Sequence, residues 1–409
     1  MSGIHPFRYY QGFFLQVFYF LVILQFVPSA CMSNSDEPVE PVEPAAWGVE
    51  NYFSRIENKR IALMVNNGSQ VHYKNLADTL LSLGLDIVKI FTPEHGFALD
   101  AENGASVSDG VYAGHDIPVI SLYGNKRKPT AGDMAGIDIL IFDLQDVGVR
   151  FFTYISSLHY IMEACAESGV SLIVLDRPNP NGHYIDGPVL KEEFRSFVGM
   201  HPVPIVYGMT IGEYALMING ESWLSDSLKC QLEVVPVQNY SHDVFYKLPV
   251  PPSPNLPNMA AIYLYPSICF FEGTIISEGR GTEAPFRLIG HPDFSDHSVS
   301  FIPEAIPGAS LNPKYKGLVC YGLDLRNIPL DTLQNKRSID LRYLLEFYND
   351  LDRGEDFFTD YFDLLAGTSE LQRQILIGYS ASEIHNSWQA DIEYFKKIRA
   401  KYLLYPDFN

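Results

Sequence analysis

Basic residues are scarce in this chain of 409 residues: 29 Lys and Arg stand against 49 Asp and Glu, a formal net charge of −20 at pH 7. So acidic a surface repels phosphate backbones, which argues against nucleic acid as a partner. Charged residues make up only 19% of the chain and hydrophobic residues 47%, a composition that excludes wholesale disorder, collagen and coiled coil. The length corresponds to roughly two or three domains of about 150 residues each.

Several common catalytic and nucleotide-binding motifs are also missing. No GxGxxG follows an expected strand and no GxxxxGK[ST] occurs, so no nucleotide cofactor is predicted. The absence of GxSxG, SxxK and HExxH argues against the common serine hydrolases and zinc proteases. The five cysteines, at 31, 165, 230, 269 and 320, lack the spacing of a metal site. We expect buried free thiols rather than a disulfide framework.

The one long apolar run lies near the N-terminus, where residues 12–27 (GFFLQVFYFLVILQFV) are apolar except for two glutamines. About 16 such residues is short for a membrane span, which needs roughly 20. Arg8 precedes the run and Pro28-Ser29-Ala30-Cys31 follows it. Residues 1–30 are therefore predicted to be a lipoprotein signal peptide, with the lipid on Cys31. A plain secretory signal and a retained anchor helix are the alternatives.

An acidic, proline-rich segment follows the leader: residues 32–46 read MSNSDEPVEPVEPAA. Such a composition cannot bury a core, so residues 31–48 are expected to form an extended tether. Leader and tether together predict a lipoprotein of the bacterial cell envelope, periplasmic or on the surface. Contact with the membrane is expected only through the lipid anchor, and the sequence leaves the oligomeric state open.

From residue 49 to about 250 the chain alternates β-rich runs with helical patterns. Near-continuous apolar runs such as Ile61–Val65, Ile137–Asp143 and Val170–Asp176 suit a parallel sheet covered on both faces. Helices are expected between the strands, including Tyr73–Leu83 and Tyr154–Glu167. The pattern predicts a doubly wound α/β domain with a mostly parallel sheet over 49–250. Prolines crowd in near residue 250, and 251–409 is predicted to be a second, α+β domain.

Ligands of doubly wound sheets bind beyond the carboxyl ends of the strands. Six polar residues fall at those ends: Glu94, His95, Asp143, Asp146, Asp176 and Arg177. Glu94 lies in the turn PEHG, and a carboxyl group in a partly apolar pocket can serve as a general acid. A turn carboxylate that accepts hydrogen bonds from nearby amides would explain Glu94 equally well.

The segment DLQDVGVRFFTY at 143–154 places two acids, an amide, a base and a phenol after a buried strand. Asp143, Asp146 and His95 could together bind a divalent metal ion, so a metal-dependent hydrolase is one hypothesis. Alternatively, the two acids have a structural role, either paired with Arg150 or as caps of the next helix. A third possibility is that part of this group orients a ligand. On that helix Glu163 lies about 100° from the apolar stripe, where a solvent-exposed side chain is expected.

Two further loops present polar side chains on rigid backbones. In DRPNPNG at 176–182 the prolines and glycine fix a turn that presents Arg177 and Asn179, unless an Asp–Arg pair simply holds the turn. In SEGRGT at 277–282 the glycines permit a close backbone approach. Arg280 there could clamp a carboxylate, or it could form a salt bridge across the domain boundary.

Several long blocks occur in a familiar order: FTPEHG, SLYGNKRKPT, FDLQDVGVRFFTYIS, VLDRPNPNG, FVGMHPVPIVYGMTIGE, PSPNLPN and YPSICFFEGTIISEGRGT. In these blocks, and from Ile61 to Tyr405, the chain resembles the exo-β-N-acetylmuramidase family. The resemblance implies a Rossmann-like domain with an active cleft between it and a second domain. It also implies a glycoside hydrolase that releases N-acetylmuramic acid from the non-reducing ends of peptidoglycan fragments, in cell-wall turnover or scavenging.

The resemblance further implies site residues. One proposed catalytic glutamate of the family lies in the EHG block and corresponds to Glu94. The other corresponds to Glu163 in the block MEACAE at 162–167, and Glu278 is the rival candidate for that second role. Muramic acid carries a lactyl carboxylate, for which the motifs offer three arginines. The expected substrate-binding set, with no metal and no cofactor, is His95, Asp143, Gln145, Asp146, Arg150, Tyr154, Arg177, Asn179, Glu278 and Arg280. A non-catalytic surface glycan-binding lipoprotein is a third hypothesis beside the glycosidase and the metal-dependent hydrolase.

Overall fold

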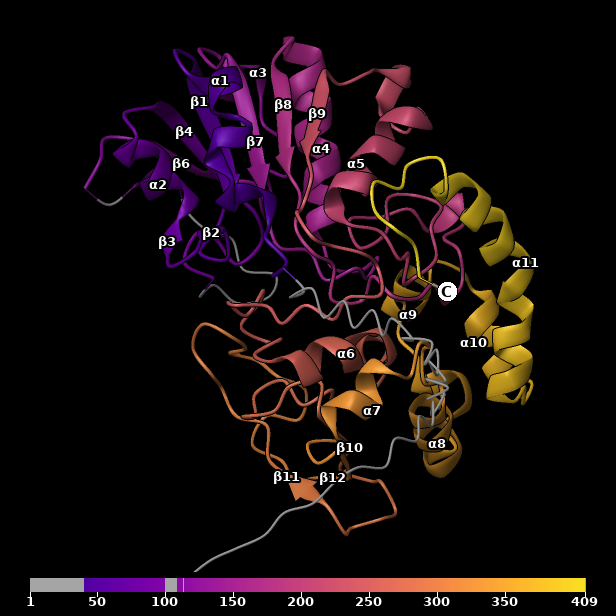
Figure 1. Ribbon diagram of the computed structural model, residues 1–409. Coiled ribbons are helices and arrows are strands. Elements are labelled where there is room, and N and C mark those ends of the chain that lie inside the picture. Colours follow the sequence, from indigo (N-terminus) through magenta and orange to yellow (C-terminus); the bar gives the residue numbers. More distant parts are fainter. Residues whose placement is uncertain (1–39, 100–108, 113, 409) are drawn as a thin grey trace, which may run out of the picture. The chain divides into compact units, whose positions relative to one another are not determined.

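Seven strands form the main sheet of this computed structural model, which describes residues 40–99, 109–112 and 114–408 (Figure 1). Their order is β5-β6-β4-β1-β7-β8-β9, and neighbours run parallel except β5 and β6. The strands are β1 (Arg60–Val65), β4 (Asp86–Thr92), β5 (Gly110–Val111), β6 (Pro118–Ser121), β7 (Ile139–Asp143), β8 (Ser171–Leu175) and β9 (Leu232–Val235). The chain moves outward from β1 in both directions, which confirms the predicted doubly wound sheet.

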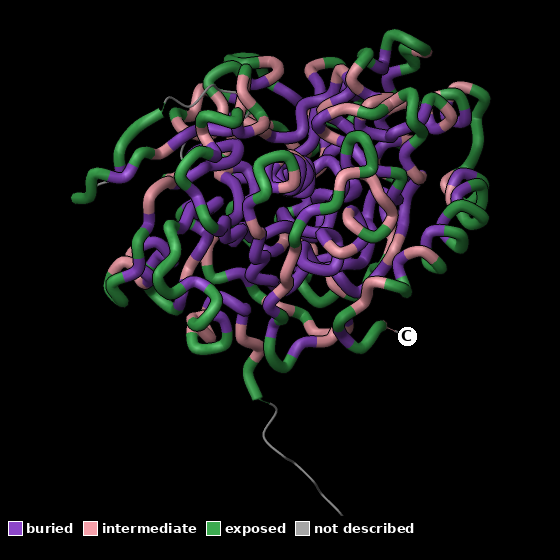
Figure 2. The backbone as a smooth tube through the Cα atoms, turned by 90° about the horizontal axis from the view of Figure 1, so that it is seen from above, coloured by how far each residue is buried: buried purple, intermediate pink, exposed green. Residues whose placement is uncertain are grey.

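Alternate residues of the central strands pack against opposite faces of the sheet. In β1, Met64 belongs to one hydrophobic cluster and Leu63 to the other. The first cluster continues into α4 (Tyr154–Ser168) and α5 (Ile211–Gly220), and the second continues into α2 (Leu76–Ser82). Helices therefore cover both faces, which explains why the strands are apolar along their whole length. Seen from above, the buried backbone gathers in the interior and the exposed backbone lies mainly toward the rim (Figure 2).

Short elements complete the sheet-bearing domain. They are α1 (Phe53–Ile56), β2 (Gln70–Val71), β3 (Lys74–Asn75) and α3 (Ala131–Met134). The helix expected at Tyr73–Leu83 begins only at Leu76, because β3 pairs with β2 as an antiparallel hairpin. The Asn75 side chain then accepts a hydrogen bond from the Ala77 N–H and caps α2.

The chain after residue 250 forms a second domain with a small antiparallel sheet in the order β10-β12-β11 (Figure 1). Its elements are α6 (Met259–Ile268), β10 (Leu288–His291), β11 (Ser300–Phe301), β12 (Cys320–Asp324), α7 (Leu330–Gln334), α8 (Arg342–Leu351), α9 (Tyr361–Ala366), α10 (Glu370–Leu376) and α11 (Ala381–Arg399). The α+β class is as predicted. Phe142 of β7 and Phe271 after α6 belong to one hydrophobic cluster, so the two domains share a core.

Part of the expected tether is folded onto the sheet-bearing domain. Ala45 and Ala46 are buried, and the Ala45 N–H donates to the Asp176 carbonyl at 3.0 Å. Glu43 forms an antiparallel bridge with Gln238. Small apolar side chains and paired backbone groups dock this stretch, so the expectation of an extended tether does not hold for residues 43–47. The expected signal peptide and its cysteine lie outside the described residues.

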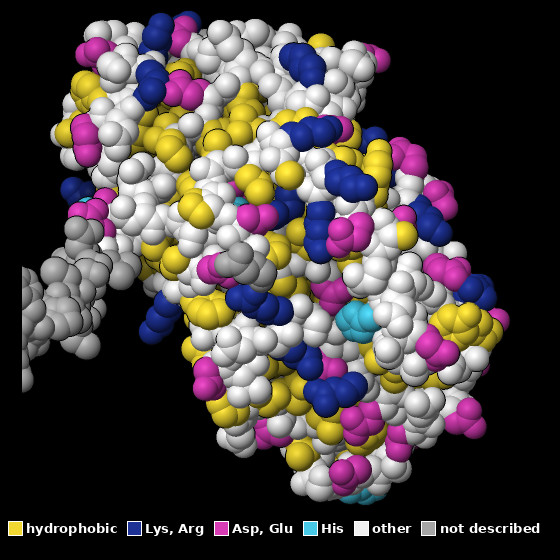
Figure 3. Space-filling view, turned by 45° about the vertical axis from the view of Figure 1, so that its right-hand side comes forward, with side chains coloured by type: hydrophobic (Ala, Val, Ile, Leu, Met, Phe, Trp, Pro, Cys, Tyr) yellow, Lys and Arg dark blue, Asp and Glu magenta, His cyan; other side chains and the backbone are white. Residues whose placement is uncertain are grey.

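Free thiols are buried in the folded part, and charges of both signs are exposed on its surface (Figure 3). Cys165, Cys230, Cys269 and Cys320 are free and buried, as expected. Within the described ranges, no helix has both the length and the apolar character needed to span a bilayer. Acidic and basic side chains are interspersed over the face shown in Figure 3, so the negative net charge does not form a single patch there.

Candidate active site

A cavity of about 430 Å³ lies beyond the carboxyl ends of β4, β6 and β7, where loops of the sheet meet the second domain. This is the edge at which doubly wound sheets bind ligands. The sheet loops contribute Glu94, His95, Tyr123, Arg127, Phe151, Phe152, Thr153 and Phe197. The second domain contributes Ser253, Asn255, Tyr265, Cys269, Glu272, Arg280, Phe286, Tyr361 and Leu365.

Glu94 reaches the cavity from the turn that follows β4. The Thr153 hydroxyl donates to Glu94 Oε2 at 2.7 Å, and the glutamate is only 5% exposed. His95, beside it, has a left-handed φ of 69°, and its Nε2 lies 3.1 Å from the Ser253 hydroxyl. Four phenylalanines line the same cavity, so the Glu94 carboxyl group has the partly apolar surroundings suited to a general acid.

Glu272 is a second cavity carboxylate, and the sequence reasoning did not select it. It lies in the 3-10 turn Cys269–Gly273 that continues α6. Arg280 Nη2 donates to Glu272 Oε1 at 2.7 Å, so a positive charge accompanies this carboxylate. The available signal was a lone acid within the apolar run YPSICFFEG, because an isolated acid in a buried segment needs a specific partner or function.

Glu278, the expected rival, is absent from the cavity lining. Its carboxylate lies 3.3 Å from Arg280 Nε and 3.3 Å from Lys314 Nζ. Arg280 is thus held between Glu272 and Glu278, and it is nearly buried. The arginine expected to clamp a substrate carboxylate is already paired with two carboxylates of the protein.

Glu163 also lies away from the cavity lining, and the expectation of a solvent-exposed side chain is wrong. It is 4% exposed and accepts hydrogen bonds from the Ser225 N–H at 2.9 Å and from Lys128 Nζ at 3.1 Å. His159 Nε2 lies 3.2 Å away. Burial opposes ionisation, but these donors hold the pKa of Glu163 well below its usual range. The donors explain how a charged side chain is buried on the flank of α4.

Asp143 and Arg177 pair with each other beneath the loops. Arg177 Nη2 donates to Asp143 Oδ2 at 2.8 Å, and Arg177 Nε donates to Oδ1. Both side chains are fully buried, and Arg177 Nη2 also donates to the Gln70 carbonyl at 3.2 Å. Asp143 and Arg177 therefore form a buried ion pair that fixes the loops after β7 and β8. The pair differs from the Asp–Arg pair considered within residues 176–182, because Arg177 reaches back to the end of β7.

The DLQD and RPNPN segments hold each other in the same way. Gln145 Nε2 donates to the Pro178 carbonyl at 2.9 Å. Asp146 Oδ2 accepts from the Gly148 N–H at 2.7 Å and from the Tyr207 hydroxyl. Burial raises the pKa of Asp146 to about 6 against the lowering effect of these hydrogen bonds. Neither Gln145 nor Asp146 is among the cavity-lining residues.

Asn179 and Tyr154 are buried supports of the loops. Asn179 Nδ2 donates to the Met209 carbonyl at 2.8 Å. The Tyr154 hydroxyl accepts from Asn66 Nδ2 at 2.9 Å and donates to the Pro252 carbonyl at 3.3 Å. Pro252 directly precedes a cavity residue, so Tyr154 ties the sheet to the cavity wall without lining the cavity itself.

Arg150 is a buried connector between the two domains. Its Nη1 donates to the carbonyls of Pro188 and Val203, both at 2.7 Å. Its Nη2 donates to Leu365 at 3.0 Å and to Ala366 at 2.7 Å, in α9 of the second domain. Because four carbonyls occupy its guanidinium, Arg150 does not hold the acids of its own segment and is not available to a substrate.

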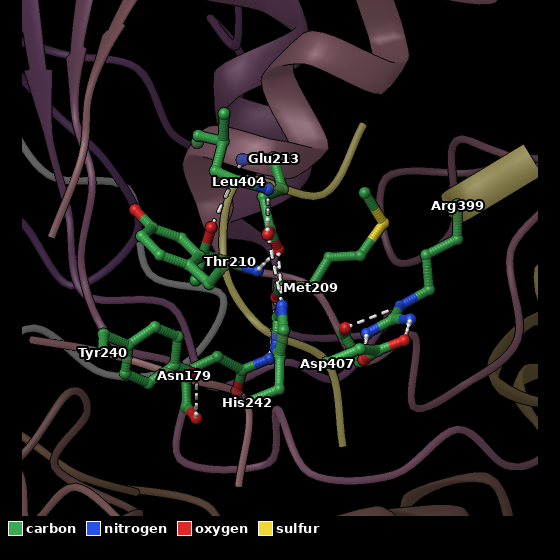
Figure 4. A network of polar contacts seen from close by, with 12 residues as sticks. Asn179, Met209, Thr210, Glu213, Tyr240, His242, Arg399, Leu404 and Asp407 are labelled. Carbon is green, nitrogen blue, oxygen red and sulfur yellow. Dashed lines mark hydrogen bonds and ion pairs between the residues drawn. The ribbon is translucent and has the colours of Figure 1, made fainter. Parts of the chain in front are cut away.

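Residues 399–407 fold back onto the sheet-bearing domain (Figure 4). Glu213, the capping glutamate of α5, accepts from the Leu404 N–H at 2.8 Å and lies 3.1 Å from His242 Nε2. Arg399 donates to both carboxylate oxygens of Asp407, at 2.6 and 2.7 Å. Polar contacts therefore fix the end of α11 and the segment that follows it.

Asp176, at the end of β8, belongs to the same support. Its carboxylate accepts from the Thr210 hydroxyl at 2.7 Å, from the Gly212 N–H at 2.8 Å and from the Tyr405 hydroxyl. Burial raises the pKa of Asp176 to about 6, although the hydroxyl donors lower it. This strand-end carboxylate therefore holds the helix α5 and the C-terminal segment instead of facing a ligand.

The residues of the metal hypothesis have separate partners. Asp143 pairs with Arg177, Asp146 accepts from Tyr207, and His95 contacts Ser253. Among the described residues, no group of three or more His, Cys, Asp or Glu side chains is placed to hold a metal ion. This arrangement gives no support to the metal-dependent hydrolase.

Comparison with known proteins finds two family models that match successive parts of the chain. The family models for the N-terminal and C-terminal parts of exo-beta-N-acetylmuramidase NamZ match residues 61–260 and 263–405. The chain belongs to the exo-β-N-acetylmuramidase NamZ family. It is 37% identical over 373 residues to peptidoglycan beta-N-acetylmuramidase NamZ of Bacillus subtilis, covering 87% of this chain and 89% of that protein.

Two crystal structures of DUF1343 family proteins from Bacteroides fragilis have the same fold. One superposes with a TM-score of 0.84 at 46% identity and covers 90% of this chain and all of that one. The other has a TM-score of 0.74 at 28% identity and covers 89% of this chain and 99% of that one. In terms of the NamZ models, Glu94 lies in the N-terminal part and Glu272 in the C-terminal part, and both line one cavity.

Proposed function

We propose that this protein is an exo-acting glycoside hydrolase that releases N-acetylmuramic acid from the non-reducing ends of peptidoglycan fragments. Membership of the NamZ family supports the reaction and the substrate class. The observation that carries the chemistry is the presence of two carboxylates, Glu94 and Glu272, in the wall of one cavity. Canonical glycoside hydrolysis uses such a pair around an oxocarbenium-like transition state.

The surroundings of the two carboxylates favour different roles. Glu94 accepts a hydrogen bond from the neutral Thr153 hydroxyl in a partly apolar wall. We therefore assign Glu94 as the general acid that protonates the leaving oxygen. The Arg280 guanidinium compensates the charge of Glu272, so we assign Glu272 to the ionised partner, as nucleophile or as the base that activates water. Proton NMR of the anomer released first separates these two reactions, because retention requires the nucleophile.

Hydrolysis of a chromogenic β-N-acetylmuramide tests both assignments. Glu94→Gln and Glu272→Gln should each lower kcat by about 100-fold or more, since a positioned acid or base contributes roughly that much. Glu283→Gln is the matched control, because Glu283 lies in the same domain but its side chain is 80% exposed and pairs with Arg326. Undiminished turnover in either variant removes that residue from the mechanism. A wild-type protein that binds muramides without turnover would instead be a glycan-binding lipoprotein.

The cell envelope is the proposed location, with a lipid on Cys31 as the membrane anchor. The support is the order of residues: an apolar run, then Pro-Ser-Ala, then cysteine, then an acidic proline-rich stretch. Metabolic labelling with a fatty acid should mark the full chain and fail to mark Cys31→Ala. A labelled Cys31→Ala would exclude the anchor, and an unlabelled wild type found free in the envelope fraction would favour the plain secretory signal.

A further inference from the structure

The cavity poses an electrostatic problem for an anionic sugar. Two carboxylates, Glu94 and Glu272, line its wall, and a muramic acid residue with a free lactyl group brings a third. Like charges at short range repel, so a cation is needed to hold the substrate carboxylate. The three arginines expected for this task are committed elsewhere: Arg150 to four carbonyls, Arg177 to Asp143, and Arg280 to two glutamates.

Arg127 is the other arginine in the cavity wall, and it differs from those three. It is exposed, and within the described chain no carboxylate pairs with it. Its Cζ lies 4.3 Å from the centre of the Phe197 ring, which also lines the cavity. A guanidinium stacked on a ring uses its flat face for that contact, so its N–H edge stays available for a carboxylate.

The Phe197 ring is itself well supported. The side chain is 9% exposed, and its backbone carbonyl accepts a hydrogen bond from the Ser156 hydroxyl at 2.7 Å. The Tyr160 ring stacks on it at 6.3 Å between centroids, with 17° between the planes. Arg127 therefore rests on a platform that α4 holds in place, which lowers the entropy cost of fixing a long side chain.

The two lysines beside Arg127 anchor its loop outside the cavity lining. Lys126 pairs with Asp133 at 2.8 Å, and Lys128 pairs with Glu163 at 3.1 Å and Glu167 at 2.6 Å. Neither lysine is among the cavity-lining residues, whereas Arg127 is. Of three consecutive cations, the outer two are neutralised by acids of α3 and α4, and the central one stands at the cavity.

We propose that Arg127 is the specificity residue that binds the lactyl carboxylate of the terminal muramic acid, and that Glu163 acts through Lys128 as a positioning residue for it. This proposal rests on the proposed function. A bidentate arginine–carboxylate contact is both strong and directional, so it distinguishes muramic acid from N-acetylglucosamine, which has no lactyl group. Arg127 thus supplies local positive charge in a chain whose net charge is strongly negative.

Kinetics on two matched substrates test the proposal: a chromogenic β-N-acetylmuramide with a free lactyl carboxylate, and the same compound with a lactyl carboxamide. Arg127→Gln should lower kcat/KM for the acid by about 10- to 100-fold, mainly through KM, and should leave the carboxamide within about threefold. Arg127→Lys should recover part of the loss, because it keeps the charge but loses the bidentate geometry. Glu163→Gln should raise KM for the acid more than for the carboxamide.

Arg195→Gln is the matched control for the loss of one positive charge. Arg195 lies two positions before the cavity residue Phe197, but it pairs with Glu192 and is itself absent from the cavity lining. The Arg195→Gln variant should therefore hydrolyse both substrates at the wild-type rate. Equal losses on the acid and the carboxamide in Arg127→Gln would overturn the proposal, as would no loss on either. If the wild type hydrolyses neither compound, the proposed function itself is overturned.

Discussion

Asp146→Asn should become more stable relative to the wild type as the pH rises. The hydrogen bonds to Asp146 come from a hydroxyl and a backbone N–H, not from a cationic side chain. Burial raises the pKa of this carboxyl from 3.8 to about 6, against the lowering effect of those bonds. The folded state therefore keeps a proton that the unfolded chain has released. This contribution to stability is fully present below pH 3.8 and is lost as the pH rises through 6.

The expected size follows from the same pKa values. A pKa unit corresponds to about 1.4 kcal/mol, so the whole pH-dependent contribution is about 3 kcal/mol. About 2 kcal/mol of it falls between pH 4.5 and pH 7.5. For the folded unit of residues 41–409, an unfolding entropy of about 2.1 cal/mol/K per residue converts this to roughly 3 °C in Tm.

Thermal unfolding of both proteins at pH 4.5, 6 and 7.5 measures this difference. The Tm of Asp146→Asn minus that of the wild type should rise by about 3 °C over the range, because groups common to both proteins cancel. Asp356→Asn, at an exposed site, should give a constant difference. Parallel curves for Asp146→Asn would refute the reasoning. Activity on the muramide should stay within about threefold, and a loss of about 100-fold would restore a substrate-binding role for Asp146.

Three further substitutions give distinct outcomes in the same thermal assay. Arg150→Met removes a donor from four carbonyl oxygens, of which only that of Val203 keeps another, the Leu190 N–H. At about 1 kcal/mol or more for each of the other three, Tm should fall by roughly 4 °C or more, and an unchanged Tm would contradict the connector role. Gly148→Ala places a Cβ 2.2 Å from the Asn179 amide at a φ of 74°, and should cost about 3 kcal/mol, or roughly 4 °C in Tm. An unchanged Tm would contradict the fixed position of the Asn179 side chain. Glu163→Gln should lower Tm at pH 7, with the difference narrowing as the pH falls through 4.5, because the folded pKa of Glu163 is lowered. A Tm difference between Glu163→Gln and the wild type that widens as the pH falls would contradict a lowered pKa of Glu163 in the folded state.

The main sheet was predictable because its signals are local. The apolar runs of β1 and β7 and the stripe of α4 mark strands and helix within a few residues, and the sheet topology follows from their alternation. Glu94 could also be found, because it falls directly after a strand at the ligand-binding edge. These features depend on neighbours in the sequence.

The rest of the site depends on distant partners. Arg150 is occupied by carbonyls about 215 residues away, and Glu163 is held by Ser225, 62 residues further along. The periodicity of apolar residues along the sequence does not indicate which arginine is engaged by distant partners and which one is available to a ligand. Glu272 was missed for the same reason, since its place in the cavity comes from the docking of the second domain on the first.

The contact between Tyr405 and Asp176 has a consequence for biosynthesis. The two residues are 229 positions apart, and the Tyr405 hydroxyl supplies a hydrogen bond to a carboxylate buried at the end of β8. At about 5–20 residues per second, a ribosome takes roughly 10 to 45 s to travel between them. During that time the Asp176 carboxylate has the Thr210 and Gly212 donors but lacks the third one, so the native contacts at the end of β8 are completed only when the last segment has been made. A nascent chain stalled before α11 is therefore expected to be a substrate for chaperones or proteases rather than a finished domain.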